Sequence, residues 1–510
     1  PQHVGFEQYW RAYQKDHQHF LDKWEPGGES PHSPGVGSEL QAHLQAEEIL
    51  EMAMTVLDRE RQIARLQEQL TDTYSSRGWK LLRSLRKSQS WLLPPESGRG
   101  EFTRRILRPA RRPIERISSS ITARSQHRQM VKARTMLAEI LSTHGDVQDI
   151  YIFPATLSWE VPLFQRPHQL ALALARAGNL VFFCEPETSG SFPPGFTKIQ
   201  ERLYVIASTD LDIFNRIVSP VVFTLAYNVN DLSCFNLPRI IYEYIDELRV
   251  LSGRQDELFQ AHNRMLLEAD VVTATADVLH RRVKPFREDA VLCPNGVDYD
   301  FITTTMSATG APPEDIRELV ENRNPIIGYY GALAEWVDYG LIEHVARNRP
   351  DFNILLIGPD YSDSVRFKQI LEISNISWLG VKPYRQIPGY LKYFDVATIP
   401  FVLNETTHST SPLKLFEYMS AGKPVVTTAM QECKKYDPVL IARDRNDFAE
   451  KLDTALELRS DSGYTARVIR VAQSNTWDQR ARTITNAVQA LRGGQNSEDL
   501  QGETDAHVNH

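Results

Sequence analysis

Short apolar runs alternate with helix-like stretches from residue 149 onward, and this alternation constrains the fold more than any other feature of the chain. A connector over 311–324, rich in acidic residues and containing two adjacent prolines, divides the runs into two series. The first comprises Ile150–Phe153, Leu180–Cys184, Val221–Leu225, Arg239–Tyr244, Val271–Thr275 and Ala290–Cys293. The second comprises Ile326–Tyr330, Asn353–Ile357, Ile376–Leu379, Val396–Ile399 and Pro424–Thr428. Strands that alternate with helices form parallel sheets, so we expect an α/β chain with two tandem Rossmann-like, doubly wound domains.

These two domains are assigned to residues 146–305 and 306–492, with a cleft between them. Open parallel sheets bind ligands beyond the carboxyl ends of their strands, so loops from both domains are expected to face the cleft. A helix around Asp478–Leu491 is expected to close the structure. The polar tail over 493–510 is predicted to be disordered.

The N-terminal third of the chain lacks this alternation of strand-like and helix-like runs. Residues 1–38 read as a short helix and a linker, and the Pro1 start predicts a piece of a longer protein. The next segment covers residues 39–76, and no Pro or Gly interrupts it from Glu39 to Thr73. Heptad a positions there are apolar and two of the four d positions are polar, which predicts a homotypic coiled coil over 44–73. A single amphipathic helix packed on its own protein is the alternative.

A basic segment follows over 77–145. Between Arg77 and Arg134 it holds 16 Lys and Arg against three Glu, a local charge of +13 in a chain whose net charge is −8. Trp and Leu residues lie between the Lys and Arg residues. This pattern predicts that residues 77–134 bind an anionic membrane surface. Nucleic acid or a solvated linker would also accommodate the charge, but the chain contains no nucleic-acid recognition motif.

Cysteine usage and hydropathy bear on the compartment. The four cysteines lie far apart and without a metal-ligand spacing, which argues against a disulfide framework or a zinc site and fits a reducing compartment. No apolar run approaches the roughly 20 residues needed to span a bilayer. We expect a cytoplasmic protein that is peripheral at the inner face of the cell membrane.

The sharpest motif runs from Ser411 to Val426 and reads SPLKLFEYMSAGKPVV. Ser411 can cap a helix whose first turn contains Pro412 and Leu413. The free amides of that turn and the charge of Lys414 favour a bound diphosphate. Glu417 lies one turn on and can accept two hydrogen bonds from the hydroxyls of a ribose. A surface helix with an ion pair between Lys414 and Glu417 is the alternative.

This motif resembles the donor-site helix of the bacterial GT-B glycosyltransferases (glycosyl transferases group 1, family-4-like) that act on surface polysaccharides. The resemblance covers about residues 149–490 and continues in the strings WEVPLFQRPHQLALALARAGNLVFFCEP (159–186), CPNGVD (293–298), IIGYYGAL (326–333), FNILLIGP (352–359) and ISWLGVKPYRQIPGYLKYFDVATIPF (376–401). It implies that the second lobe binds a nucleotide diphosphate sugar and the first lobe the acceptor.

The resemblance also implies roles for single residues. Glu417 becomes the ribose ligand and Lys414 a diphosphate ligand, while Val381 and Tyr384 contact the base. Gly331 lets the backbone approach the phosphates. Two departures stand out: Ser409 replaces a second glutamate that many relatives carry, and Glu335 lies where many have cations. They leave open whether the reaction retains or inverts the sugar configuration.

Three residues of the first lobe are candidates for catalysis. Arg166 and His168 surround Pro167 at the predicted start of a helix facing the cleft. Arg166 could pair with an acceptor phosphate and His168 could contact the sugar, although either could instead cap the helix or lie on the surface. Asp246 follows a strand and is a candidate for activating the acceptor.

We therefore predict transfer of a hexosyl group from a nucleotide diphosphate sugar to a polysaccharide or lipid-linked glycan. No metal or other cofactor is expected, because GT-B enzymes stabilise the departing diphosphate with amides and cations. A nucleotide-sugar epimerase of the same fold is one alternative. A catalytically degenerate, membrane-associated assembly partner is another, favoured by Ser409 and Glu335.

Overall fold

The computed structural model describes residues 129–186, 191–207, 211–248, 255–308, 310–361 and 365–506, with side chains described to Leu491 at the C-terminal end. The predicted helix and linker at 1–38, the coiled coil at 39–76 and most of the basic segment at 77–145 lie outside these residues. Contacts between Cα atoms place residues 129–510 in one unit, so the two lobes are described together. Within the described residues, no helix combines the length and the apolar character needed to cross a membrane.

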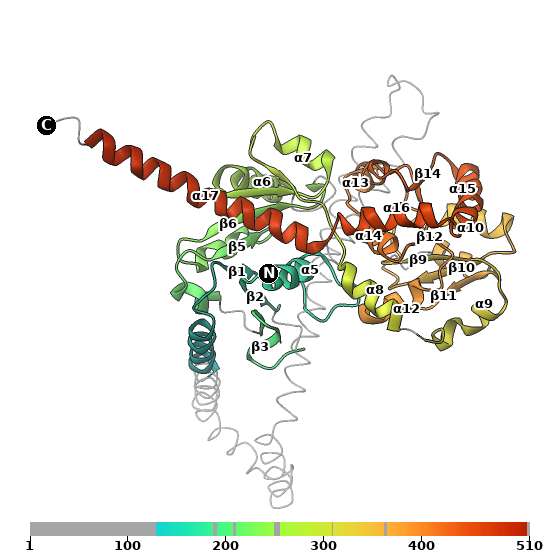
Figure 1. Ribbon diagram of the computed structural model, residues 1–510, viewed down its shortest axis with the longest axis horizontal. Helices are drawn as coiled ribbons and strands as arrows, with labels where there is room; N and C mark the ends of the chain where they lie inside the picture. The colour runs from blue at the N-terminus through green and yellow to red at the C-terminus, as the bar shows by residue number, and fades with distance from the viewer. Residues whose placement is uncertain are drawn as a thin grey trace, which may run out of the picture. The chain divides into compact units, whose positions relative to one another are not determined.

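The first lobe is built on an eight-stranded sheet of order β3-β4-β2-β1-β5-β6-β7-β8 (Figure 1). Only β3 is antiparallel to its neighbour. Its strands are β1 (Ile150–Phe153), β2 (Leu180–Cys184), β3 (Gly195–Gln200), β4 (Leu203–Ala207), β5 (Val221–Thr224), β6 (Arg239–Tyr244), β7 (Val271–Ala274) and β8 (Val291–Leu292). Its helices are a helix over 129–143, α5 (Arg166–Arg176), η1 (Leu211–Arg216), η2 (Val229–Cys234), α6 (Gln255–Glu268) and α7 (Asp277–Val283).

The second lobe is a six-stranded, wholly parallel sheet of order β11-β10-β9-β12-β13-β14. Its strands are β9 (Ile326–Tyr330), β10 (Asn353–Ile357), β11 (Ile376–Trp378), β12 (Val396–Ile399), β13 (Val425–Thr428) and β14 (Leu440–Ala442). Its helices are α8 (Tyr299–Ala308), η4 (Glu314–Ile316), α9 (Arg317–Glu321), α10 (Tyr339–Asn348), α11 (Val365–Ile370), η5 (Tyr384–Gln386), α12 (Ile387–Leu391), α13 (Glu405–His408), α14 (Leu413–Ser420), η6 (Cys433–Lys435), α15 (Arg445–Leu458) and α16 (Ser462–Gln473).

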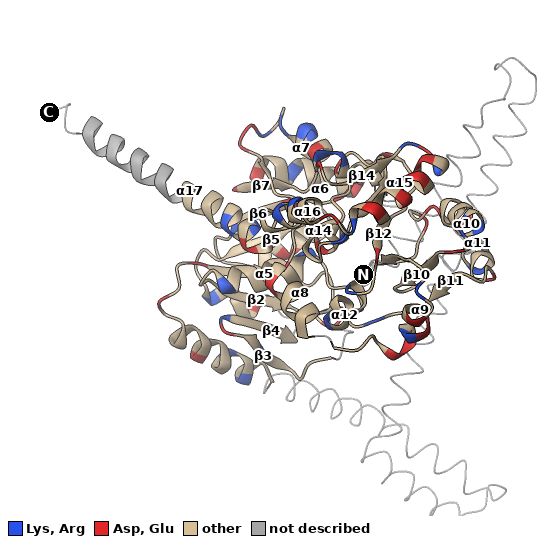
Figure 2. Ribbon diagram, turned by 45° about the vertical axis from the view of Figure 1, so that its right-hand side comes forward, with Lys and Arg blue, Asp and Glu red and all other residues tan. Residues whose placement is uncertain are grey.

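Apolar strands explain why helices cover both faces of each sheet. Strands β2, β9 and β10 are buried along their whole length, as expected for central strands of a parallel sheet. In Figure 2 the strands are drawn mostly in tan, and the charged residues lie mainly on helices and loops. The predicted pair of doubly wound domains is confirmed.

The last helix, α17 (Trp477–Ala506), differs from the prediction in two ways. Trp477, Ala481, Ile484 and Val488 recur every three or four residues and pack into the core that α5 forms in the first lobe. By packing, α17 therefore belongs to the first lobe, although residues up to 492 were assigned to the second. The helix also continues to Ala506, past the predicted start of disorder at Gly493; no proline interrupts it, and each glycine costs only about 1 kcal/mol.

Candidate functional site

Two of the predicted ligand residues, Gly331 and Lys414, meet at the carboxyl edge of the second sheet. Gly331 directly follows β9 with φ +139°, and a Cβ added there would lie 2.7 Å from Cε of Lys414. Gly358 follows β10 with φ +143°, and its Cβ would lie 1.9 Å from the carbonyl oxygen of Gly331. Both positions require glycine, because side chains would displace the backbone and the lysine that line this edge.

Lys414 lies in the first turn of α14 over two aromatic rings. Its Nζ is 4.9 Å from the ring centroid of Phe401 and 5.5 Å from that of Tyr329. Burial lowers the pKa of the ammonium to about 8, against a smaller raising effect of Cys433. No carboxylate in the described part of the chain forms an ion pair with it, so the alternative of a Lys414–Glu417 ion pair is wrong. A cation without a protein counter-charge is available to an anionic ligand.

Glu417 is a buried carboxyl one turn further along α14. Only 3% of the residue is exposed. None of the described residues donates a hydrogen bond to its carboxyl, and burial raises the pKa of Glu417 to about 8. Buried carboxyls normally have partners, so hydroxyl groups of a ligand could supply the missing bonds.

Ser411 does not cap this helix as predicted. The residue at the cap is Pro412, with φ −75° and ψ 117°, and the helix begins at Leu413. Residues before a proline avoid helical angles, which moves the helix start past Ser411. The Ser411 hydroxyl instead accepts a 3.2 Å hydrogen bond from the amide of Asn295, whose Nδ2 donates to the Ser411 carbonyl at 2.6 Å. Ser411 thus ties α14 to the segment between β8 and α8.

Tyr384 contacts the first lobe. Its ring stacks on Phe164 and on Phe301, with centroids 5.4 and 5.2 Å away. Its hydroxyl accepts a 2.9 Å hydrogen bond from Nε2 of Gln169 on α5. These contacts hold the ring, which is half-buried. Val381 is 46% exposed and follows β11 by three residues.

Arg166 is held in a buried ion pair. Its Nη2 and Nε donate to Oε1 of Glu243 at 2.7 and 3.1 Å, and its Nη1 donates to the carbonyl of Pro294 and to Oδ1 of Asn295. Burial alone would lower the pKa of the guanidinium, but the charges of Glu243 and Cys293 and the hydrogen bonds to them together outweigh burial and raise the pKa above its ordinary value. With four donors committed to protein acceptors, Arg166 does not face an acceptor phosphate in this structure.

His168 caps the start of α5. Its Nε2 donates to the carbonyl of Ser158 at 2.8 Å, and its Nδ1 accepts from the amide of Gln165 at 3.2 Å. Burial lowers the pKa of the ring to about 4, so it is neutral. Both ring nitrogens therefore form hydrogen bonds with the backbone next to the helix start. His168 thus has the capping role, which was the alternative to a contact with the sugar.

Asp246 lies after β6 among carboxylates that have arginine partners. Glu247 pairs with Arg282 of α7, and the same arginine pairs with Glu405 of the second lobe at 2.6 Å. Asp246 itself is half-buried, and burial raises the pKa of its carboxyl to about 6. The structure places it at the carboxyl edge of the first sheet, as predicted, beside a contact between the lobes.

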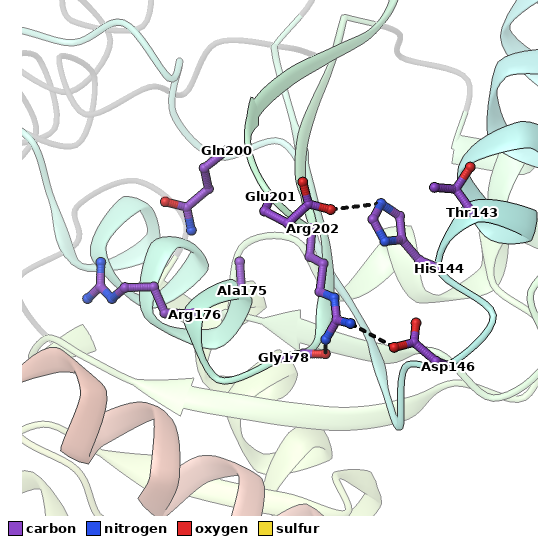
Figure 3. Close-up of a pocket in the computed structure, with 9 residues that line it drawn as sticks. All are labelled: Thr143, His144, Asp146, Ala175, Arg176, Gly178, Gln200, Glu201 and Arg202. Atoms are coloured by element: carbon purple, nitrogen blue, oxygen red, sulfur yellow. Dashed lines mark hydrogen bonds and ion pairs between the residues drawn. The ribbon is translucent and has the colours of Figure 1, made fainter.

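A hollow of about 650 Å³ lies away from these residues (Figure 3). Gly178 and Arg202, which line it, lie just before β2 and β4, so it opens at the amino edge of the first sheet. Both arginines that line it already form ion pairs. Arg202 contacts Asp146 at 2.8 Å, and Arg176 contacts Asp298 and Asp478. The hollow is therefore not the site at which the predicted residues converge.

Sequence reasoning missed Tyr329, Gly358 and Phe401, which complete the surroundings of Lys414 and Gly331. Gly358 and Phe401 follow β10 and β12, so the rule that ligands bind beyond strand ends could have found them. The surroundings of Lys414 hold no metal cage: within the described residues, no group of three or more His, Cys, Asp or Glu side chains could hold a metal ion.

Residues 324–458 match the family model described as Glycosyl transferases group 1. A Bacillus subtilis (strain 168) protein that is named as a teichuronic acid biosynthesis glycosyltransferase, TuaH, is 27% identical over 272 residues, which cover 49% of this chain and 67% of that protein.

Solved structures of low sequence identity share the fold. Sucrose-phosphate synthase from Thermosynechococcus elongatus superposes with a TM-score of 0.52 at 15% identity, covering 68% of this chain and all of that one. Anabaena Alr3699/HepE, solved in complex with UDP-glucose, superposes with a TM-score of 0.50 at 14% identity, covering 67% and 99%. The two-lobed fold inferred from the resemblance is confirmed.

Proposed function

We propose that this chain is a GT-B glycosyltransferase that transfers a hexosyl group from a nucleotide diphosphate sugar to a polysaccharide or lipid-linked glycan. The match of residues 324–458 to the glycosyl transferases group 1 model and the two-lobed fold support this proposal. The polysaccharide acceptor is supported by the relative named for teichuronic acid biosynthesis. A nucleoside diphosphate hexose as donor is supported by the Anabaena structure, which was solved in complex with UDP-glucose.

The strongest support for the donor site is the arrangement around Lys414. A cation without a counter-charge lies against Gly331 at the start of α14, where helix amides and the positive end of the dipole favour a diphosphate. The Glu417 carboxyl accepts hydrogen bonds from the ribose hydroxyls, and the exposed Val381 contacts the base. Ser411, Pro412 and Leu413 shape the turn that brings these groups together.

The chemistry needs charge stabilisation more than proton transfer to the donor. As the bond between the sugar and the diphosphate breaks, negative charge grows on the leaving oxygen, and Lys414 with the helix amides stabilises it without a metal. Closure of the lobes excludes water from the reacting atoms. Asp246, at the facing edge of the first lobe, accepts a hydrogen bond from the acceptor hydroxyl.

The N-terminal segments place the enzyme at its acceptor. The cations, Trp and Leu residues over 77–134 support binding to the anionic inner face of the cell membrane, and the heptads over 44–73 support a homo-oligomer. Co-sedimentation with vesicles containing anionic lipid tests the first claim. Deletion of 77–134 should abolish sedimentation, and unchanged sedimentation of the deleted protein would remove the claim.

Calorimetry with UDP, GDP and ADP tests the donor site. Glu417→Ala should weaken binding of the preferred nucleotide by about tenfold or more, and Lys414→Met by at least as much, because each removes a buried interaction with the ligand. Glu417→Gln keeps the shape and one acceptor oxygen, so its loss should be smaller. Glu457→Ala, an exposed glutamate on α15, serves as the matched control. Unchanged affinity of Glu417→Ala would refute the assignment.

Product analysis separates transfer from the epimerase alternative. With labelled nucleotide hexose and an added glycan, the label should move to the glycan. Isomerisation of the donor in the absence of any acceptor would instead show that the same fold carries out a different reaction.

A further inference from the structure

Tyr227 is an exposed aromatic residue at the carboxyl edge of the first sheet. It lies in the loop between β5 and η2, and 55% of its surface is exposed. The other large exposed apolar residues of this lobe lie elsewhere: in the described residues they are Val131 in the helix over 129–143 and Val218, Leu237, Leu267 and Phe286, which precede β5 to β8 at the opposite edge. The carboxyl edge of the described first sheet thus carries one large exposed apolar side chain.

The loop holds Tyr227 in a fixed position. Oδ1 of Asn228 accepts a 2.7 Å hydrogen bond from the amide of Leu225, and the amide of Asn228 donates to the carbonyl of Leu225. Leu225 and Ala226 are buried beneath this turn. The turn therefore anchors its neighbours in the core and leaves the Tyr227 ring outside, so little ordering of the backbone is needed for the ring to meet a ligand.

Tyr227 lies close to Asp246. The pKa of its phenol is raised first by burial and then by the charges of Asp246 and Glu243. Strands β5 and β6 are adjacent and parallel, with Thr224 opposite Tyr242, so the loops carrying Tyr227 and Asp246 are neighbours.

Asp246 pairs with no cation of the described residues, unlike Glu243 and Glu247 on either side of it. Glu243 pairs with Arg166, and Glu247 pairs with Arg282. Among the described residues, no ion pair or hydrogen bond to the Asp246 carboxyl is found. The two neighbouring loops thus present an exposed aromatic ring and a carboxylate that can accept hydrogen bonds.

The loop that carries Asp246 belongs to the side of the first lobe that contacts the second lobe. Arg282, which pairs with Glu247 next to Asp246, also reaches Glu405 at the start of α13. Helix α13 is followed closely by α14, which carries Lys414. Tyr227 and Asp246 therefore lie on the face of the first lobe that an acceptor placed opposite the donor would contact.

We propose that Tyr227 and Asp246 form a subsite for an uncharged sugar residue at the end of the acceptor, a conclusion that rests on the proposed function. The apolar face of the pyranose ring packs on Tyr227, and a ring hydroxyl donates a hydrogen bond to Asp246. A uronic acid or a phosphate is disfavoured there, because it would face the Asp246 carboxylate while Arg166 remains committed to Glu243.

The test uses the full chain with UDP-glucose as donor and a series of p-nitrophenyl acceptors: the β-glucoside, the β-galactoside, the β-glucuronide and the 6-phosphorylated β-glucoside. Tyr227→Ala should raise KM for the neutral glycosides about tenfold, while Tyr227→Phe, which keeps the ring face, should stay within about twofold. Asp246→Asn should reduce the preference for neutral over charged glycosides. Phe286→Ala, an exposed aromatic at the opposite edge, should leave transfer unchanged.

Calorimetry with UDP on the same variants distinguishes a failure of the acceptor subsite from a failure of the proposed donor site. UDP affinity that is retained in Tyr227→Ala while KM for the glycoside rises supports the acceptor subsite. Unchanged KM in Tyr227→Ala, or a wild-type preference for the glucuronide or the phosphorylated glycoside, would overturn it while leaving the donor site intact. Absence of UDP, GDP and ADP binding in the wild type would instead refute the donor site of the proposed function.

Discussion

Replacing Arg166 with Met should destabilise the first lobe strongly rather than weaken the binding of an acceptor. The guanidinium makes two hydrogen bonds to one oxygen of Glu243, at 2.7 and 3.1 Å, and each side chain of this pair is only 5% exposed. Removing one partner leaves a buried charge uncompensated, which costs about 3–5 kcal/mol. For a lobe of this size that loss lowers the melting temperature by roughly 6–20 °C.

A double-mutant cycle with Glu243→Gln measures this pair directly, by calorimetric melting and by urea titration followed through tryptophan fluorescence. The double variant should be more stable than the sum of the single losses predicts, with a coupling of about 2 kcal/mol or more. Arg176→Met, on the last turn of the same helix, is the matched control: its ion pairs are partly exposed, so it should cost less than about 1 kcal/mol. An Arg166→Met protein that melts within about 2 °C of the wild type but has a raised KM for phosphorylated acceptors would refute the reasoning.

Three further outcomes follow from the same contacts. Gly331→Ala should weaken UDP binding in calorimetry, because its Cβ would meet Lys414 Cε at 2.7 Å and displace the cation; wild-type affinity would show that the lysine is not a ligand. UDP affinity should fall as pH rises through about 8, where Lys414 loses its proton, and transfer should rise through about 6 as Asp246 ionises; a flat pH profile would contradict both assignments. Arg282→Ala should increase amide hydrogen exchange in α13, because it removes the ion pair to Glu405; unchanged exchange would show that this contact does not hold the lobes together.

The fold was predictable because most strands are buried on both faces. Apolar runs such as Leu180–Cys184 and Asn353–Ile357 became strands with the predicted bounds. Strand β3, Gly195–Gln200, was not predicted, because it is an antiparallel edge strand whose sequence mixes polar and apolar residues. Edge strands bury only part of their surface, so the apolar pattern that marks a central strand is absent.

The residues of the proposed donor site were easier to bring together from the sequence than those of the acceptor side, because they are local in sequence. Lys414 and Glu417 belong to one helix, and Gly331 directly follows a strand, so a strand-end rule and a helix period suffice to bring them together. The partners of Arg166 and Tyr384 come from distant parts of the chain: Glu243 is 77 residues from Arg166, and Gln169 is 215 residues from Tyr384. No local pattern predicts such contacts.

What distinguishes functional from structural charges in this chain is the partner that each one has. Arg166, chosen from sequence as a ligand for an acceptor phosphate, has a buried carboxylate of its own, whereas Lys414, Glu417 and Asp246 have no protein counter-charge within the described residues. Leaving a polar or ionisable group buried without a partner costs free energy, so a fold retains it only where something else supplies the missing interaction. Two of these groups lie on α14 and the third faces the donor lobe from the first sheet. The bonds they lack are those that a diphosphate, a ribose and an acceptor hydroxyl would make, which is why these three positions, rather than the arginine and histidine around Pro167, are where substitutions should change catalysis without unfolding the protein.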